Sequence, residues 1–223
     1  MIKDRASHTE KVLREEIIFS AKRLHKRNML AAADGNISYR LTNDRILITP
    51  AGVAKSLIHP EDIAVITIDN QIISGHPSSE RLMHLAVYQH CPQAQCVVHA
   101  HPPTAIAWSI ARPHLTELPS RSLSELIISV GRIPIVPYAR PGTQSMGDVL
   151  LPYLPVNRLM ILARHGGLAW GESLGEAVNG LERLEHTAEI LFRAEQLGGI
   201  SDLPNDEIHY LQQLRKKLGD RIL

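Results

Sequence analysis

The segment CVVHAHPP, residues 96–103, decides how the centre of this sequence folds. Its two valines favour an extended backbone, and its two prolines end the strand. On a strand, side chains two positions apart point to the same face, so His99 and His101 would converge; on a helix they would splay apart. Two converging imidazoles are what a zinc site needs, although for this pair alone surface or structural histidines remain the alternative.

Further strands and helices are predicted on both sides of this segment. Short apolar runs bounded by turn residues predict strands at 45–49, 63–68, 71–74, 133–137 and 159–163, the second and third forming a hairpin. Apolar residues at helical spacing predict helices at 10–28, 79–90, 105–111, 173–197 and 206–218, of which 173–197 is the longest. Strands in the first three quarters, flanked by helices, predict a layered α/β (α+β) fold.

Composition limits the class of protein. A chain of 223 residues with 44% hydrophobic residues suits a single domain over residues 1–223, with two small domains as the alternative. The formal net charge of +1 gives no reason to expect nucleic acid or a membrane as a partner. The polar start MIKDRASHTE lacks a signal-peptide core, and no apolar run reaches the ~18 residues of a membrane span, so we expect a cytoplasmic protein.

His165 strengthens the metal hypothesis. It follows the apolar strand LMILAR and precedes Gly166-Gly167, and glycines at a strand end let other groups approach. The alternative is a hydrogen-bonded loop histidine. A third imidazole beside His99 and His101 would complete a three-nitrogen set that leaves one coordination position open for substrate.

Glu80 is the carboxylate candidate. The stretch PSSE, residues 77–80, is typical of a helix start, with a serine at the cap and a glutamate in the first turn. That capping role is the simple interpretation. In the functional one, Glu80 ligates the metal or acts as a base beside it, while Ser78, Ser79 and the free N–H groups of the helix start bind phosphate.

Two turns offer further donors. Residues 34–38 (DGNIS) and 49–52 (TPAG) have the composition of tight turns beside strands. Ordinary turn chemistry explains both. The functional alternative is that Asn36 and the Gly52 amide bind an anionic group. Five further histidines should not be metal ligands: His59, His76, His84, His90 and His114. Of these, His84 lies one helical turn after Glu80 and should pack at a surface or interface.

Six motifs together resemble those of the class II aldolase/adducin family, whose enzymes include L-fuculose-1-phosphate aldolase and L-ribulose-5-phosphate 4-epimerase. They occur in family order over residues 10–200, and their order makes coincidence unlikely where each alone is weak. The motifs are GNIS at 35–38, ITPAG at 48–52, PSSE at 77–80, VVHAHP at 97–102, VPYARPGT at 136–143 and RHGG at 164–167.

The resemblance implies a fold, a metal site and an assembly. The fold would be a central, largely antiparallel sheet with helices on both sides, and the assembly a C4 homotetramer with active sites at subunit interfaces. One divalent ion, Zn²⁺ or alternatively Mn²⁺, Co²⁺ or Fe²⁺, would be held by three histidines and, without substrate, by Glu80. The implied metal ligands are His99, His101, His165 and Glu80, and the implied phosphate-binding residues are Asn36, Gly52, Ser78 and Ser79.

The implied chemistry is that of a lyase. A Lewis-acidic ion chelated by adjacent carbonyl and hydroxyl oxygens stabilises the enediolate left when a C–C bond breaks, and Glu80 moves a proton. The main expectation is an aldolase that cleaves a phosphorylated ketose, in sugar or pentose catabolism. Pentulose-phosphate 4-epimerase, methylthioribulose-phosphate dehydratase-like and decarboxylase activities use the same scaffold. A non-enzymatic adducin-like scaffold is disfavoured because every ligand is kept.

The sequence departs from the aldolase pattern at three positions. Two tyrosines of the fuculose-phosphate aldolases align with Leu123 and Leu218, and a threonine of their phosphate loop aligns with Ala51. The aldol proton donor is therefore undefined. Glu125, near the acid/base glutamate of the dehydratase branch, is a possible substitute, and an ordinary helix glutamate is the alternative.

Overall fold

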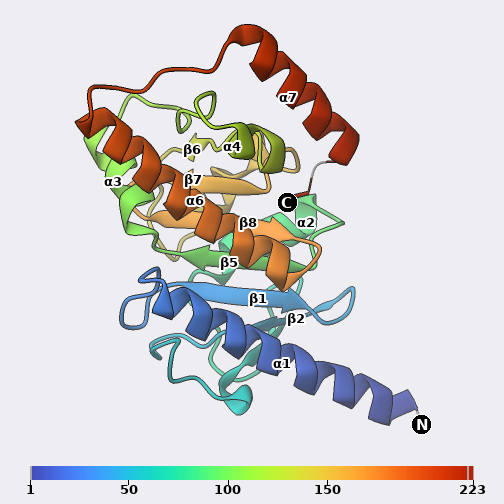
Figure 1. The fold of residues 1–223 in the computed structure, drawn as a ribbon. Coiled ribbons are helices and arrows are strands. Elements are labelled where there is room, and N and C mark those ends of the chain that lie inside the picture. Colours follow the sequence, from blue (N-terminus) through green and yellow to red (C-terminus); the bar gives the residue numbers. More distant parts are fainter. Residues whose placement is uncertain (1, 220, 223) are drawn as a thin grey trace.

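The segment around His99 lies in the middle of a single sheet. The computed structural model describes residues 2–219, 221 and 222, with side chains from residue 9 onward, so most of the polar start lies outside the described side chains. The strands are β1 Asn36–Arg40, β2 Arg45–Ile48, β3 Ala64–Thr67, β4 Ile72–Ser74, β5 Cys96–Ala100, β6 Ile135–Val136, β7 Leu159–Leu162 and β8 Gly166–Gly171. They form one eight-stranded sheet in the order β4-β3-β2-β1-β5-β8-β7-β6 (Figure 1).

The sheet is largely antiparallel, as predicted. All neighbouring strands pair antiparallel except β6 and β7, which run parallel. Antiparallel pairing of β5 with both β1 and β8 brings distant parts of the chain into register, because Asn36 lies opposite His99 and Ala100 lies opposite Gly167. The hairpin predicted over 63–74 is confirmed as β3 and β4.

Helices cover both faces of the sheet. They are α1 Ile2–Lys26, α2 Arg81–His90, α3 Pro103–Ala111, α4 Ser124–Ser129, α5 Ser145–Asp148, α6 Leu174–Gln196 and α7 Asn205–Leu218, with 3-10 turns at Pro60–Asp62 and Leu151–Tyr153. α1, α3 and α6 cover one face, with α1 and α6 in contact (Figure 1). α2 and α5 bury their apolar side chains against the other.

Two apolar clusters result, one on each side of the sheet. Strand residues alternate between them, so Val98 packs with the α1 and α6 side and Val97 with the α2 side. α7 packs instead on α4 through Ile127, Ile208 and Leu211, beside the main body (Figure 1). The predicted layered fold, with helices flanking a central sheet, is confirmed; that residues 1–223 act as one domain stays a prediction.

Two local predictions are wrong, and one strand was not predicted. α1 has 25 residues and α6 has 23, so 173–197 is not the longest helix; the extra turns of α1 are polar and give no apolar period. Residues 36–38 belong to strand β1 rather than to a turn. Strand β8 was not predicted, because three of its six residues are glycines, which favour strands poorly. Pairing with β5 and β7 on both sides holds β8 in place.

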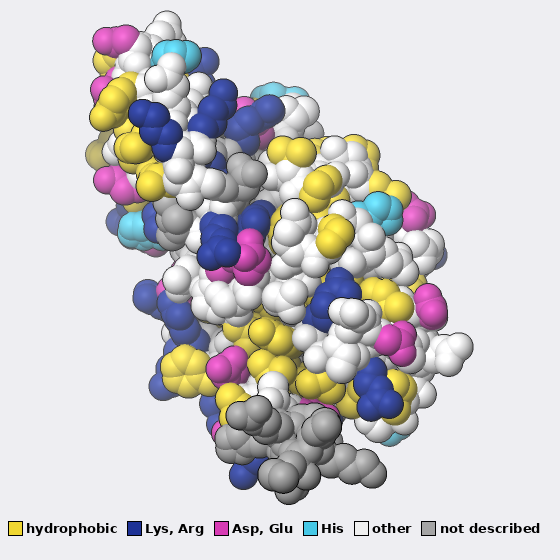
Figure 2. All heavy atoms as spheres, turned by 90° about the vertical axis from the view of Figure 1, so that its right-hand side faces the viewer, with side chains coloured by type: hydrophobic (Ala, Val, Ile, Leu, Met, Phe, Trp, Pro, Cys, Tyr) yellow, Lys and Arg dark blue, Asp and Glu magenta, His cyan; other side chains and the backbone are white. Residues whose placement is uncertain are grey.

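Surface features agree with the composition. Basic and acidic side chains are interspersed over the face drawn in Figure 2, as a nearly balanced charge would give. Among the described residues, no helix combines the length and apolar character that crossing a membrane requires. Cys91 and Cys96 are buried and free.

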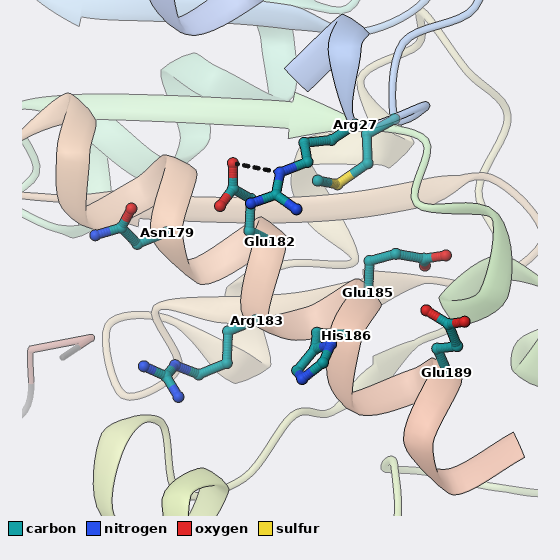
Figure 3. A pocket seen from close by; sticks show the side chains of 8 residues that line it. Arg27, Asn179, Glu182, Arg183, Glu185, His186 and Glu189 are labelled. Atoms are coloured by element: carbon teal, nitrogen blue, oxygen red, sulfur yellow. Dashed lines mark ion pairs between the residues drawn. The ribbon is translucent and has the colours of Figure 1, made fainter. Parts of the chain in front are cut away.

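A polar pocket of about 580 Å³ lies against α6, and its carboxylates are committed to structural contacts (Figure 3). Glu182 pairs with Arg23 at 2.7 Å and lies 3.6 Å from Arg27. Glu185 accepts hydrogen bonds from the backbone N–H groups of Thr104 and Ala105 at 2.9–3.1 Å. A carboxylate from α6 therefore caps α3, the helix that follows the His99-His101 segment.

This cap predicts an effect on stability. Glu185→Ala should lower the free energy of unfolding by about 1–2 kcal/mol, because it leaves N–H groups of α3 without an acceptor. Glu189→Ala is the matched control, since Glu189 forms an exposed ion pair with Arg193 one turn away, and should cost less than about 0.5 kcal/mol. Urea unfolding followed by circular dichroism measures both. Equal losses in the two variants would contradict a capping role.

Candidate active site

Three imidazoles converge at one end of the sheet. His99 is the fourth residue of β5, His101 follows that strand, and His165 lies in the turn between β7 and β8. Their ring centroids are 4.8–5.2 Å apart, and their candidate ligand atoms lie within 4.8 Å of one another. This cluster could hold a divalent metal ion.

Glu80 lies beside the same point. One of its carboxylate oxygens is 3.0 Å from His165 Nε2 and the other is 3.4 Å from His99 Nε2. Glu80 occupies the N-cap position of α2, which begins at Arg81. The predicted serine cap is therefore wrong, because both serines precede the helix. The Glu80 side chain makes no capping hydrogen bond and turns to the histidines instead.

The ring nitrogens are arranged as a metal would need them. His99 Nδ1 donates to the Gly167 carbonyl at 2.9 Å, which leaves its Nε2 lone pair facing His101 Nε2 at 3.1 Å. His101 Nδ1 lies 3.3 Å from a carboxylate oxygen of Asp34. His165 Nδ1 is buried and lacks a hydrogen-bond partner among the described residues. Imidazole nitrogens that face each other or lack a hydrogen-bond partner have lone pairs available to coordinate a metal cation.

Electrostatics keep these groups in ligating form. Burial lowers the pKa of His99 to about 3, against the opposing charge of Glu80, so the imidazole is neutral. Burial alone would raise the pKa of Glu80. The hydrogen bond with His165, electrostatic interaction with the His99 and His165 rings, and the hydrogen bond from the Asn36 amide lower it to about 2, so Glu80 is a carboxylate at neutral pH.

The glycine at 166 makes room for the histidines. A Cβ there would lie 2.5 Å from the Ala100 carbonyl oxygen, 2.5 Å from a ring carbon of His99 and 3.0 Å from one of His101. Any side chain at this position would displace the proposed ligands. The RHGG motif therefore contributes both a histidine and the space that lets it approach the others.

A buried chain of hydrogen bonds orients Glu80 from behind. Asn36 Nδ2 donates to Glu80 at 2.9 Å, so the Asn36 oxygen faces His84 Nε2, with which it makes a short hydrogen bond. The other His84 nitrogen bonds Ser38 Oγ at 2.7 Å, and Ser38 bonds the Tyr88 hydroxyl at 2.8 Å. His84 therefore donates through Nε2, and because burial lowers its pKa to about 4 the ring is neutral and its Nδ1 accepts from Ser38. His84 is fully buried, so its predicted surface or interface role is wrong.

The predicted phosphate-binding residues border the same cavity. A pocket of about 490 Å³ is lined by Asn36, Gly52, Ser78 and Ser79 together with Glu80, His101 and His165. Ser79 is exposed, while Ser78 is buried and its hydroxyl accepts from the Glu80 backbone N–H at 3.3 Å. Gly52 has φ +70° and open space where a Cβ would stand. These positions suit binding of an anion beside the metal ligands, and their role stays a prediction.

The lining residues that had no individual role assigned from the sequence include Asp34, Lys55, Pro141 and Gly142. Pro141 and Gly142 belong to the VPYARPGT motif, whose place in the pocket the sequence did not define. Asp34 lies two residues before Asn36, which was a usable signal. Lys55 gave none, because lysines are usually exposed and this one is 2% exposed.

Glu125, the possible substitute for the aldol proton donor, is not among the described residues that line this pocket. It lies on α4 with an exposed side chain that accepts a hydrogen bond from Ser124 at 2.9 Å. Leu123 packs against the apolar cluster on the α1 and α6 side, and Leu218 is half exposed at the end of α7.

The fold, the order of the motifs and a histidine cluster that could hold a metal ion together indicate an enzyme scaffold, and the comparisons agree. The profile described as "Class II Aldolase and Adducin N-terminal domain" matches residues 15–192. The chain belongs to the class II aldolase/adducin family.

Three relatives give finer detail. A 3-oxo-tetronate 4-phosphate decarboxylase of Escherichia coli is 35% identical over 189 residues, covering 82% of this chain and 87% of the relative. A 5-deoxy-D-ribulose 1-phosphate aldolase of Bacillus thuringiensis is 30% identical over 217 residues, covering 93% and 97%. The crystal structure of YgbL from Escherichia coli, described as aldolase/epimerase/decarboxylase, has a TM-score of 0.85 at 32% identity, covering 92% and 99%.

Asp34 should tune metal affinity. Its carboxylate accepts from His101 Nδ1, which would fix that ring and raise its basicity as a ligand. Asp34→Asn should weaken Zn²⁺ binding about 10-fold, measured by competition with a chromophoric chelator. Asp44→Asn, in an exposed turn, is the control. Unchanged affinity in Asp34→Asn would remove the orienting role.

His84 should make stability depend on pH. Burial lowers its pKa to about 4, against the opposing charge of Glu80, while the unfolded side chain titrates near 6.5. Its contribution is complete above pH 6.5 and is lost as pH falls toward 4, by up to roughly 3 kcal/mol. His84→Gln should therefore reduce the difference in unfolding free energy between pH 7 and pH 4.5, measured in metal-free protein. An unchanged difference would show that His84 does not titrate this way.

Proposed function

We propose that this protein is a metal-dependent decarboxylase of a phosphorylated 3-oxo sugar acid, in sugar catabolism. The observation that carries the proposal is the Glu80 carboxylate, which contacts two of three converging imidazoles and lines a pocket suited to an anion. The 35% identity to a 3-oxo-tetronate 4-phosphate decarboxylase supports this choice over the aldolase expected from the motifs.

The reaction follows from the substrate's chemistry. A carboxylate two carbons from a ketone leaves as CO₂ when the bond between them breaks and its electron pair moves toward the ketone. The carbon left behind then takes up one proton, so a 3-oxo-tetronate 4-phosphate would give dihydroxyacetone phosphate. When bound, a divalent ion supplies the Lewis acidity that draws electrons toward the carbonyl oxygen.

The chain's own residues would do the rest. His99, His101 and His165 would hold the ion, Zn²⁺ being our first choice. Ser78, Ser79, Asn36 and Gly52 would bind the phosphate. Glu80, ionised at rest, would take up a proton from solvent and pass it to the carbon that lost CO₂, with Asn36 holding one of its oxygens at 2.9 Å. Decarboxylation removes no proton from a departing hydroxyl, so it does not need the aldolase tyrosines that Leu123 and Leu218 replace.

Aldol cleavage of a phosphorylated ketose is the second candidate. The identity of 30% to an aldolase that covers 93% of this chain favours it. We also propose, from the family resemblance, a C4 homotetramer in which neighbouring subunits complete each site. A monomer in sedimentation that keeps full activity would contradict that assembly.

A product screen tests the function. We expect CO₂ and a triose phosphate from 3-oxo-tetronate 4-phosphates, with activity lost on chelation and restored by Zn²⁺, Mn²⁺, Co²⁺ or Fe²⁺. Glu80→Gln should lower kcat by about 10²–10⁴-fold with metal content unchanged, whereas Glu125→Gln should cost less than about tenfold.

Other outcomes point elsewhere. Aldehyde release from ketose 1-phosphates without CO₂ release would replace the decarboxylase by the aldolase. Epimerisation of a pentulose 5-phosphate or dehydration of methylthioribulose 1-phosphate would select those branches. Loss of activity in Glu125→Gln, with metal content intact, would favour the dehydratase.

A further inference from the structure

Lys55 is a buried cation in the wall of the candidate active site. Its side chain is 2% exposed, and its Nζ donates to the carbonyl of Ala33 at 2.8 Å and to that of Val53 at 2.7 Å. The first carbonyl directly precedes Asp34, and the second directly follows Gly52. One ammonium group therefore ties together two loops that line the same pocket.

The charge of the pocket makes this lysine significant. Among the described residues that line it, Lys55 is the only lysine or arginine, while Asp34 and Glu80 are carboxylates. The predicted phosphate-binding residues are neutral. A phosphate dianion entering beside two carboxylates would be repelled unless a cation offset them. Nearby Arg81 is committed elsewhere, to the Asn70 side chain at 2.6 Å and to the Ser78 carbonyl at 3.3 Å.

Lys55 has enough N–H donors to hold the two loop carbonyls and also to bind an anion. An ammonium group carries three N–H donors, and the two loop carbonyls take two of them. Burial lowers the pKa of Lys55 below its ordinary value, and the negative charges of Asp34 and Glu80 partly offset that effect. A charged group held by two rigid carbonyls is already oriented before any ligand arrives, so little ordering is needed on binding.

We propose that Lys55 supplies the positive charge that binds the substrate's phosphate group and fixes the Asp34 and Gly52 loops around it. This inference rests on the proposed function only in that the substrate carries a phosphate. Lys55 acts on binding rather than on bond breaking, so its loss should raise KM for a phosphorylated substrate far more than it lowers kcat.

Inorganic phosphate is the probe, titrated calorimetrically into metal-loaded protein at low ionic strength. Lys55→Met should weaken phosphate binding about 10- to 100-fold, the value of one hydrogen bond to a charged group. Lys55→Gln keeps two N–H donors for the loop carbonyls but has no charge, and it should weaken binding similarly. Lys22→Met, on the exposed face of α1, should bind phosphate as the unmodified protein does. Metal content and thermal stability are measured for every variant.

Each outcome decides the matter without turnover. Loss of phosphate binding in Lys55→Gln with metal content kept supports the proposal, whichever reaction the enzyme catalyses. Three results would overturn it. These are no phosphate binding by the unmodified protein, normal phosphate binding by Lys55→Gln, and phosphate affinity that depends on the metal but is unchanged by either substitution of Lys55. If Lys55→Met loses its metal or does not fold, Lys55→Gln alone gives the answer. Failure of the decarboxylase assay would leave the phosphate titration unaffected.

Discussion

The hydrogen bond from His99 Nδ1 to the Gly167 carbonyl is the contact on which the site depends. It joins β5 to β8 across the sheet, fixes the ring of a fully buried histidine and leaves its other nitrogen free to ligate. It forms because β5 and β8 pair in a register that puts Ala100 opposite Gly167. The same register brings Gly166 against His99 and His101, where only a glycine fits. Strand pairing, rather than any single loop, therefore sets the geometry of the histidine cluster.

Burying so many polar groups would be costly if they lacked partners, and the chain from Tyr88 to Glu80 shows how that cost is met. Asn36 and Ser38 face α2 because alternate residues of β1 share a face, and α2 supplies His84 and Tyr88 at the matching height. Burial keeps His84 neutral, so each group in the chain donates once toward the next and Asn36 offers its amide to Glu80. A network in which every hydrogen bond runs in one direction has a single stable arrangement. It holds Glu80, on the connection between β4 and α2, against histidines from β5 and from the turn between β7 and β8.

Much of the fold and part of the site could be predicted from the sequence, for identifiable reasons. The helix over α6 and the hairpin of β3 and β4 carry clear periods, and spacing on a strand brought His99 and His101 together. Strand β8 could not be predicted, because its glycines conceal a strand that only its neighbours stabilise. His84 and Lys55 were missed for a related reason: both are polar residues whose burial depends on partners far away in the sequence. A local pattern assigns such residues to the surface, since it cannot show the carbonyls and amides that compensate for lost water.

The remaining constraint is charge, and it couples the two halves of the pocket. The described lining carries the carboxylates of Asp34 and Glu80 and the ammonium group of Lys55, so these three side chains together have one net negative charge. A divalent cation among the histidines would change this to one net positive charge. An anionic ligand meets repulsion in the first state and attraction in the second, over distances short enough that little salt screening intervenes. Binding of cation and anion must therefore favour each other by the same free energy, because linkage is reciprocal. Lys55 contacts both halves of the pocket. One of its carbonyl partners precedes Asp34, whose carboxylate contacts His101, and the other follows Gly52.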